Sequence, residues 1–315
     1  MSLIETNLFK RLLALTPFSE KELTTLIATA PTRYKDHYID KRNGRGKRLI
    51  SQPTKEIKFL QRLLISRELA NLPIHSAAVA YRQGLSIVAH AEPHASANYL
   101  LKLDFKDFFP SITSEALARN LKHDKNYTAA ELWLITRILC RLDRQSERLR
   151  LSIGAPSSPF ISNYMLFEFD QRLTEFCDQK NIKYTRYADD LALSSNVPKV
   201  LDEAKKMVEK LLSDFSYLGL VLNEEKTVNV SQKNRRTLVG LTLSNAGNVS
   251  VGRDAKRLIR AQMHRASQGQ LSVVEFLSLK GRLAFLLSVD PEFVHSLCSK
   301  YGFSNVEAVS FSKKN

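Results

Sequence analysis

Three aspartates interrupt segments that otherwise have the pattern of buried β-strands, and they limit the folds open to this chain. Residues 99–109 (YLLKLDFKDFF) are apolar, aromatic and close to alternating, which predicts a strand that carries Asp104. Residues 182–194 (IKYTRYADDLALS) predict a β-hairpin with Asp189 and Asp190 at its tip. A carboxylate in an apolar strand costs free energy unless it is paired or bound to a cation. The fold must therefore bring these strands to a place that a cation can reach.

The same three carboxylates suggest a chemistry. If the two strand segments are neighbours, Asp104, Asp189 and Asp190 would form a site of hard oxygen ligands suited to Mg²⁺. Two-metal phosphoryl transfer needs such a site, because one ion activates the attacking hydroxyl and the other steadies the leaving pyrophosphate. The alternative is structural, since an Asp-Asp pair at a hairpin is often only turn chemistry.

The remaining periodicity indicates a mixed chain. Helical spacing predicts helices over residues 56–72, 131–142 and 160–177, and another that starts at Pro198. Short strands are expected around residues 220–222 and 237–243, and residues 41–48 (KRNGRGKR) should form the cation-rich tip of a hairpin. From about residue 252 we expect a small helical subdomain. The order strand, helix, hairpin, helix, strand indicates an α/β (α+β) core of split-βαβ type.

The charge of the chain favours a polyanionic partner. Its 315 residues include 47 Lys and Arg against 32 Asp and Glu, which gives a formal net charge of +15. This excess favours nucleic acid or an anionic membrane surface, and a merely basic soluble surface is the simpler alternative.

The longest apolar runs are too short to span a bilayer. The three cysteines lie far apart and form no CxxC pair, which favours buried positions in a reducing compartment. We expect a soluble, cytoplasmic protein with no membrane partner.

Five ordered blocks resemble the motifs of reverse transcriptases. They are residues 103–112 (LDFKDFFPSI), 154–159 (GAPSSP) followed by Ser162-Asn163, 187–190 (YADD), 222–227 (LNEEKT) and 238–241 (LVGL). Their order and spacing agree with that family over about residues 33–300, which is more specific than any single block. Within the family the chain most resembles the bacterial retron enzymes. Two departures are His90, where those enzymes carry the Asn of an NAxxH-like element, and Val239, where they carry the Thr of a VTG element.

The resemblance implies a right-hand polymerase with fingers, a split-βαβ palm and a small helical thumb. The N-terminal region and fingers would occupy residues 1–98. The palm would occupy residues 99–250, with finger helices inserted at about 114–150, and the thumb residues 251–315.

The resemblance also implies a metal site. Asp104 and Asp189 would bridge two Mg²⁺ ions, with Mn²⁺ as a substitute, and Asp190 and the backbone carbonyl of Phe105 would complete the site.

Five residues match positions that contact the incoming dNTP: Arg48, Lys47, Phe109, Pro156 and Lys226. A ring at Phe109 would collide with a ribose 2′-OH, so dNTPs rather than NTPs are the expected substrates. Arg48 and Lys47 would grip the triphosphate, and Lys226 would protonate pyrophosphate. The structural alternatives are core packing for the ring and a solvated surface for the cations. Ile153 replaces the Gln that many reverse transcriptases use near the nucleotide sugar, and it cannot make that hydrogen bond.

Basic residues near the C-terminus recur at helical spacing and are expected to bind RNA or DNA: Arg253, Lys256, Arg257 and Arg260. By resemblance they would lie in the thumb and track duplex phosphates, and the simpler alternative is a solvated charged face. His94 is also expected to contact RNA or to have a local structural role. Zinc at His90 and His94 is not favoured, because Pro93 disrupts the helix that their spacing would need.

The retron resemblance implies a particular reaction. The enzyme would recognise a cognate structured non-coding RNA, prime from the 2′-OH of a branching guanosine, and make single-stranded DNA joined to RNA by a 2′,5′ bond (msDNA). Such systems act in antiphage defence together with an effector toxin encoded at the same locus. Two alternatives remain open: another bacterial reverse transcriptase primed from a 3′ end, and an RNA-binding scaffold with a silent polymerase site.

Overall fold

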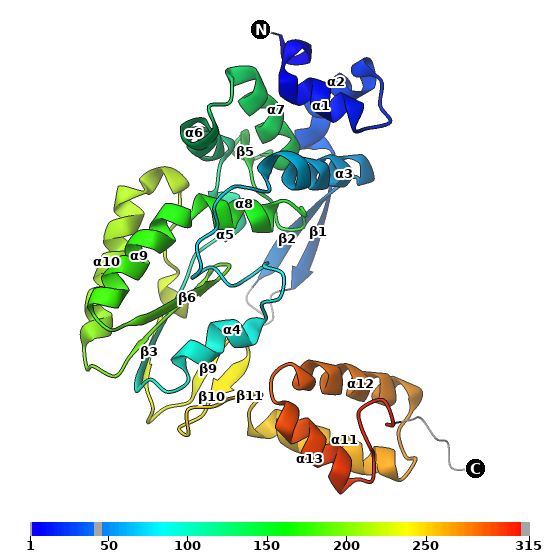
Figure 1. Ribbon diagram of the computed structural model, residues 1–315, viewed down its shortest axis with the longest axis vertical. Coiled ribbons are helices and arrows are strands. Elements are labelled where there is room, and N and C mark those ends of the chain that lie inside the picture. The colour runs from blue at the N-terminus through cyan, green and yellow to red at the C-terminus, as the bar shows by residue number, and fades with distance from the viewer. Residues whose placement is uncertain (1, 41–45, 310–315) are drawn as a thin grey trace.

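The computed structural model describes residues 2–40 and 46–309, and its centre is a four-stranded antiparallel sheet (Figure 1). The strand order is β6-β7-β3-β8. The strands are β3 (Tyr99–Asp104), β6 (Lys183–Tyr187), β7 (Asp190–Ser195) and β8 (Val228–Ser231). The expected hairpin over residues 182–194 is therefore confirmed as β6-β7. Strand β8 lies apart from the predicted strands.

Alternation along the strands gives the sheet two different faces. Leu101 and Leu103 of β3 join the main hydrophobic cluster with helices α9 (Phe167–Gln179) and α10 (Val200–Asp214). Leu100, on the opposite face, packs in a second cluster with Ala91 of helix α4 (Ile87–Ala91). That cluster also includes a small sheet of β9 (Arg236–Leu238), β10 (Leu241–Leu243) and β11 (Val249–Ser250). Asp104 alternates with Leu103 and so lies on the face away from α9 and α10.

The N-terminal part, up to His94, consists of short helices and turns and one β-hairpin. It contains 3-10 turns at Leu3–Glu5, Ala30–Thr32 and Glu92–His94, helices α1 (Asn7–Ala14), α2 (Glu20–Thr29) and α3 (Lys55–Leu64), a π-helical turn (Ile65–Leu69), and the hairpin β1 (Tyr34–Asp40) with β2 (Lys47–Pro53). The hairpin agrees with the prediction, although residues 41–45 of its expected tip lie outside the described residues.

Several predicted elements end earlier than expected. Strand β3 stops at Asp104, and the short helix α5 (Phe108–Ser111) follows, because Asp107 takes a left-handed conformation with φ 47°. The segment predicted to carry inserted helices contains α6 (Ser114–Lys125) and α7 (Ala129–Leu139), followed by the hairpin β4 (Arg141–Asp143) and β5 (Arg148–Arg150). The helix expected over residues 160–177 is two helices, α8 (Ser158–Met165) and α9.

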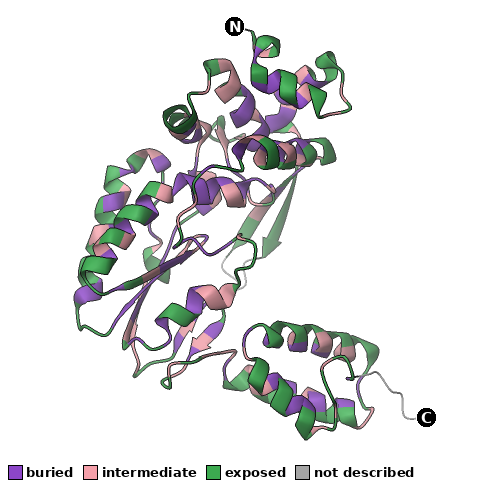
Figure 2. Ribbon diagram, in the orientation of Figure 1, coloured by how far each residue is buried: buried purple, intermediate pink, exposed green. Residues whose placement is uncertain are grey.

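Beyond α10, 3-10 turns occur at Ser216–Leu218 and Glu224–Lys226, before the chain ends in three helices. These are α11 (Arg253–Ser267), α12 (Val273–Leu287) and α13 (Pro291–Lys300). They share a hydrophobic cluster of their own, which includes Met263, Leu283 and Val294, and they lie apart from the rest of the molecule in Figure 1. Figure 2 shows purple buried positions inside this helical group as well as around the central sheet.

Two composition-based predictions can be compared with the structure. Cys140, Cys177 and Cys298 are all buried free thiols, as expected. No helix within residues 2–40 and 46–309 has the length and apolar character needed to cross a membrane.

Candidate active site

The pairing of β3 with β7 brings the predicted carboxylates together. Asp104 is the direct cross-strand partner of Asp190, so both side chains lie on the same face of the sheet. The N–H of Phe105 donates to the backbone carbonyl of Asp189 at 3.0 Å, which fixes the turn beside the end of β3. Asp104 is only 5% exposed. Like charges placed opposite each other destabilise a sheet, so this arrangement needs a positive partner.

The pKa values report the same repulsion. Burial, followed by the charge of Asp104, raises the pKa of Asp189. Burial, followed by the charges of Asp189 and Asp104, raises the pKa of Asp190 to about 6. The positive charges of Lys226 and Arg48 oppose the rise in the pKa of Asp189. Contact of Arg48 with a nucleotide stays a prediction.

In this structure Asp104 forms a salt bridge with Lys226. Its Nζ donates to both carboxylate oxygens of Asp104, at 2.8 and 2.9 Å, and the lysine side chain is half exposed. Within the described ranges, no three His, Cys, Asp or Glu side chains are gathered closely enough to hold a metal ion. The donor chemistry nevertheless fits a divalent cation, because such an ion neutralises three carboxylate groups whose like charges repel one another.

A cavity of about 360 Å³ is lined in part by Tyr81, whose pKa is raised by burial and then by the charge of Asp189. Phe109 and Pro156, both predicted to contact a nucleotide, line it, and so does Ile153. Four further lining residues were not singled out from the sequence: Gln52, Lys58, Arg62 and Tyr81. The ring of Tyr81 lies 6.4 Å from that of Phe109, between centroids, so aromatic groups form one wall.

The loop that forms another wall is held against β2. Ser51 N–H donates to the carbonyl of Ile153 at 2.8 Å. Gly154 has φ +109°, and a Cβ there would meet the carbonyl oxygen of Ser51 at 3.0 Å. The close approach requires glycine, which explains the first residue of the GAPSSP block. Lys47 and Arg48 are exposed at the start of the same strand, β2.

The expected RNA contact of His94 is wrong. Its side chain is fully buried, with Nδ1 2.7 Å from Ser194 Oγ and Nε2 2.8 Å from Thr185 Oγ1. Burial lowers the pKa of His94 to about 3, so the ring is neutral at physiological pH. A ring with no exposed atoms cannot touch RNA, and the local structural role is the one the structure supports. The His94 ring links β6 to β7, because Thr185 lies on β6 and Ser194 on β7.

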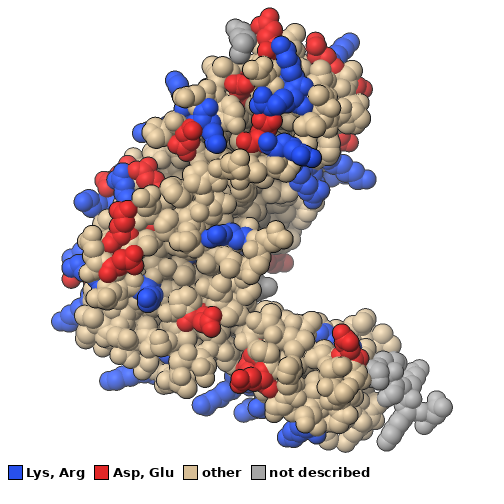
Figure 3. Space-filling model, viewed as in Figure 1, with Lys and Arg blue, Asp and Glu red and all other residues tan. Residues whose placement is uncertain are grey.

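The basic residues of α11 divide into two groups. Arg253, Arg257 and Arg260 are exposed, and Lys256 is partly buried. Lys256 pairs with Asp290 Oδ2 at 2.6 Å, and both Lys256 and Arg260 lie over the ring of Phe293, at 4.5 and 5.0 Å from its centroid. Lys256 therefore also fastens α11 to α13. On the face in Figure 3, an open hollow separates the C-terminal helices from the rest of the molecule, and Lys and Arg are spread over the upper part and the outer edges of that face. Nucleic-acid contact by this helix stays a prediction.

Comparisons with known proteins agree with this geometry. Residues 39–243 match the family described as reverse transcriptase (RNA-dependent DNA polymerase). The chain is 37% identical to the retron Ec83 reverse transcriptase of Escherichia coli over 292 residues, covering 91% of this chain and 93% of that protein. It is 32% identical to the retron Ec86 reverse transcriptase of Escherichia coli over 295 residues, covering 91% and 88%.

The fold has a relative among solved structures. Apo telomerase from Candida tropicalis superposes with a TM-score of 0.54 at 13% identity, covering 96% of this chain and 61% of that chain. This likeness concerns the fold alone, and it confirms the expected polymerase architecture. Together with the family match and the identity to retron enzymes, it leads to one assignment. The chain belongs to the retron reverse transcriptases and is an RNA-directed DNA polymerase.

Proposed function

We propose that this enzyme copies a cognate structured non-coding RNA into single-stranded DNA, priming from the 2′-OH of a branching guanosine to give a branched RNA–DNA hybrid (msDNA). The observation that carries the proposal is the placement of Asp104 opposite Asp190, with Asp189 in the adjoining turn. A cavity with Tyr81 and Phe109 in one wall supports a nucleotide site near them. The net charge of +15 supports an RNA partner. The retron names of the similar proteins support the branched product.

The chemistry assigned to the carboxylates is two-metal phosphoryl transfer. Asp104, Asp189 and Asp190, with the carbonyl of Phe105, would hold two Mg²⁺ ions or Mn²⁺. When bound, the ions would lower the pKa of the attacking hydroxyl and stabilise the charge on pyrophosphate. The pKa values of Asp189 and Asp190, raised first by burial and then by the neighbouring carboxylates, support this assignment, because a bound divalent cation would stabilise both ionised groups.

The other residues would bind and orient the nucleotide. Arg48 and Lys47 would contact the triphosphate, and Phe109 would exclude a ribose 2′-OH from the cavity that it lines together with Pro156. Lys226 would leave Asp104 and donate a proton from Nζ to the leaving pyrophosphate. Its side chain is half exposed and lies on a short 3-10 turn, which supports access to a bound nucleotide. Arg253, Lys256, Arg257 and Arg260 would contact the phosphates of the template–product duplex.

The biological setting is part of the same proposal. The enzyme and its msDNA would act in the cytoplasm in antiphage defence, holding an effector toxin from the same locus in check. The buried, unpaired thiols of all three cysteines are compatible with a reducing compartment.

The test is to purify the protein with its native locus and to analyse the nucleic acid that accompanies it, first with RNase and then with a 2′,5′-debranching enzyme. A discrete single-stranded DNA whose mobility changes on debranching is the expected result. DNA without a branch would favour a reverse transcriptase primed from a 3′ end. Bound RNA without DNA, with dNTPs and Mg²⁺ supplied, would favour the scaffold alternative.

A further inference from the structure

The turn that carries the paired aspartates contains a strained residue. Tyr187 pairs with Asp190, so Ala188 and Asp189 form a two-residue turn. Ala188 has φ +58° and is buried. A residue with a Cβ adopts this left-handed conformation only at a cost, and it persists where surrounding contacts enforce it. The contact that the structure gives the Ala188 carbonyl comes from Arg186 Nη1, at 3.1 Å.

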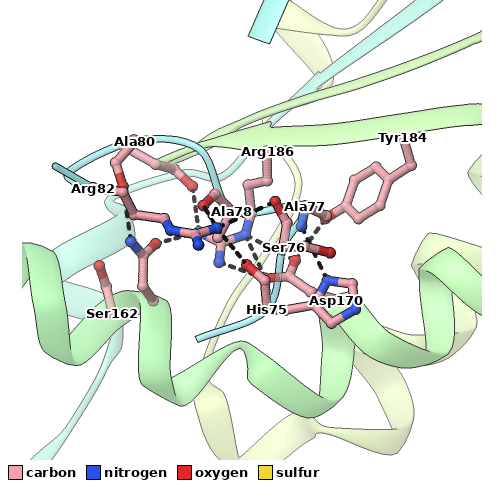
Figure 4. A network of polar contacts seen from close by, with 12 residues as sticks. His75, Ser76, Ala77, Ala78, Ala80, Arg82, Ser162, Asp170, Tyr184 and Arg186 are labelled. Atoms are coloured by element: carbon pink, nitrogen blue, oxygen red, sulfur yellow. Dashed lines mark hydrogen bonds and ion pairs between the residues drawn. The ribbon is translucent and has the colours of Figure 1, made fainter. Parts of the chain in front are cut away.

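Arg186 is itself completely buried, as is its partner Asp170 on α9. Its Nε donates to Asp170 Oδ1 at 2.9 Å and its Nη2 to Asp170 Oδ2 at 2.5 Å, which is a bidentate pair (Figure 4). Tyr184 O–H donates to the same carboxylate at 2.7 Å. A buried ion pair gives little net stability compared with apolar packing. Its geometric effect is larger, because the guanidinium is planar and cannot shift without breaking several bonds.

The same guanidinium holds a second segment. Arg186 Nη1 also donates to Asn163 Oδ1 at 3.2 Å, and Asn163 Nδ2 donates to the carbonyl of Ala80 at 2.9 Å (Figure 4). The backbone of Arg186 makes two hydrogen bonds to the same segment. Its N–H donates to the carbonyl of Ala77 at 2.7 Å, and its carbonyl accepts from the N–H of Val79 at 2.9 Å. The next residue along the segment is Tyr81, whose ring lines the cavity.

We propose that Arg186, oriented by Asp170, is a positioning residue for polymerisation. Through the Ala188 carbonyl it sets the peptide plane that precedes Asp189, and so the direction of that carboxylate. Through Asn163 and the bonds to residues 77–80 it sets the position of Tyr81 in the nucleotide cavity. The inference rests on the proposed catalytic role of Asp189. It adds that one buried side chain fixes the catalytic turn and the cavity wall relative to each other.

The first test is Arg186→Lys in a dNTP incorporation assay. Lysine keeps a positive charge beside Asp170, but one ammonium cannot reach Asp170, Asn163 and the Ala188 carbonyl together. We expect kcat to fall at least ~10-fold, because a small displacement of the reacting groups lowers the rate. The KM for dNTP should stay within about two-fold of the wild-type value. The Mg²⁺ concentration that gives the half-maximal rate should rise. The matched control is Arg236→Lys, since Arg236 is also a buried arginine that donates to backbone carbonyls, among them those of Ala95 and Ser244.

A second variant separates positioning from folding. Arg186→Met with Asp170→Asn removes both buried charges and keeps an acceptor for Tyr184, so the fold is retained while the Ala188 carbonyl loses its donor. We expect a melting temperature near that of the wild type and a kcat that remains at least ~10-fold low. Recovery of both the melting temperature and kcat in this double variant would overturn the proposal. So would a kcat for Arg186→Lys equal to that of the control.

Asp189→Asn, measured beside them, keeps the two claims distinguishable. If Asp189→Asn is active, the proposed role of Asp189 fails. If Asp189→Asn is inactive while both Arg186 variants have wild-type kcat, the catalytic role stands and the positioning role fails.

Discussion

Replacing Asp190 by asparagine should make the metal-free protein more stable while abolishing DNA synthesis. The pKa of Asp190 is raised from 3.8 to about 6, first by burial and then by the charges of Asp189 and Asp104. Each pKa unit corresponds to about 1.4 kcal/mol, so the ionised side chain costs the folded state about 3 kcal/mol. Asparagine has a similar shape and no charge, so it removes this cost.

The pH dependence gives the sign of the effect. The folded protein binds the Asp190 proton more tightly than the unfolded chain does, so its free energy of unfolding falls as the pH rises from about 4 to about 6. Above that range the wild type stays at its lower value. The Asp190→Asn variant should therefore exceed the wild type by up to about 3 kcal/mol at pH 7.5, and by little at pH 4.

The assay is urea unfolding in EDTA at both pH values, with RNA-templated dNTP incorporation measured in parallel. Asp143→Asn is the control, because the expected change in its free energy of unfolding has the opposite sign. A hydrogen bond from Ser146 lowers the pKa of Asp143, so its ionised form contributes stability that the variant should lose at pH 7.5. An Asp190→Asn protein that is no more stable than the wild type at pH 7.5 would refute the repulsion on which the site assignment depends.

Three further substitutions test other parts of the account. Phe109→Ala should raise the incorporation of ribonucleotides relative to deoxynucleotides, and an unchanged ratio would move the steric gate elsewhere. Reversing the charge of Arg257 and Arg260 to Glu should weaken RNA binding and reduce the slope of log K against log salt by roughly one to two; an unchanged slope would return α11 to a solvated face. His94→Ala should lower the free energy of unfolding by about 2–4 kcal/mol, because Thr185 and Ser194 lose a buried partner, and it should leave the RNA affinity of the folded protein unchanged.

The hairpin at the centre of the site could be predicted because its information is local. Alternating residues on both sides of Asp189 and Asp190 define two strands and a tip, and the structure has them as β6 and β7. The residue at which β3 ends was harder to predict from the sequence. The aromatic run after Asp104 continues the strand pattern, and only the left-handed backbone at Asp107 turns it into α5. Strand β8 has a short, half-exposed pattern that carries little periodic signal.

The partners of the site residues could not be predicted, because they lie far away in sequence. The buried ring of His94 is hydrogen-bonded to Thr185 and Ser194, about a hundred residues later in the chain. No residue near His94 in the sequence indicates these partners. The pairing of Lys226 with Asp104 likewise joins segments that only the folded sheet brings together. Arg186 does carry a signal in the sequence. It is a charged residue between aromatic residues in a predicted strand, and if the strand is buried it needs a partner, which is the argument that singles out Asp104.

The most direct measurement of the central claim is RNA-templated incorporation of dNTPs by the wild type and by the double variant Asp189→Asn with Asp190→Asn, together with RNA affinity for both. The carboxylate site predicts extension by the wild type, no detectable extension by the double variant, and equal RNA binding. Synthesis retained by a double variant that binds RNA normally would contradict the assignment of these aspartates as the catalytic centre.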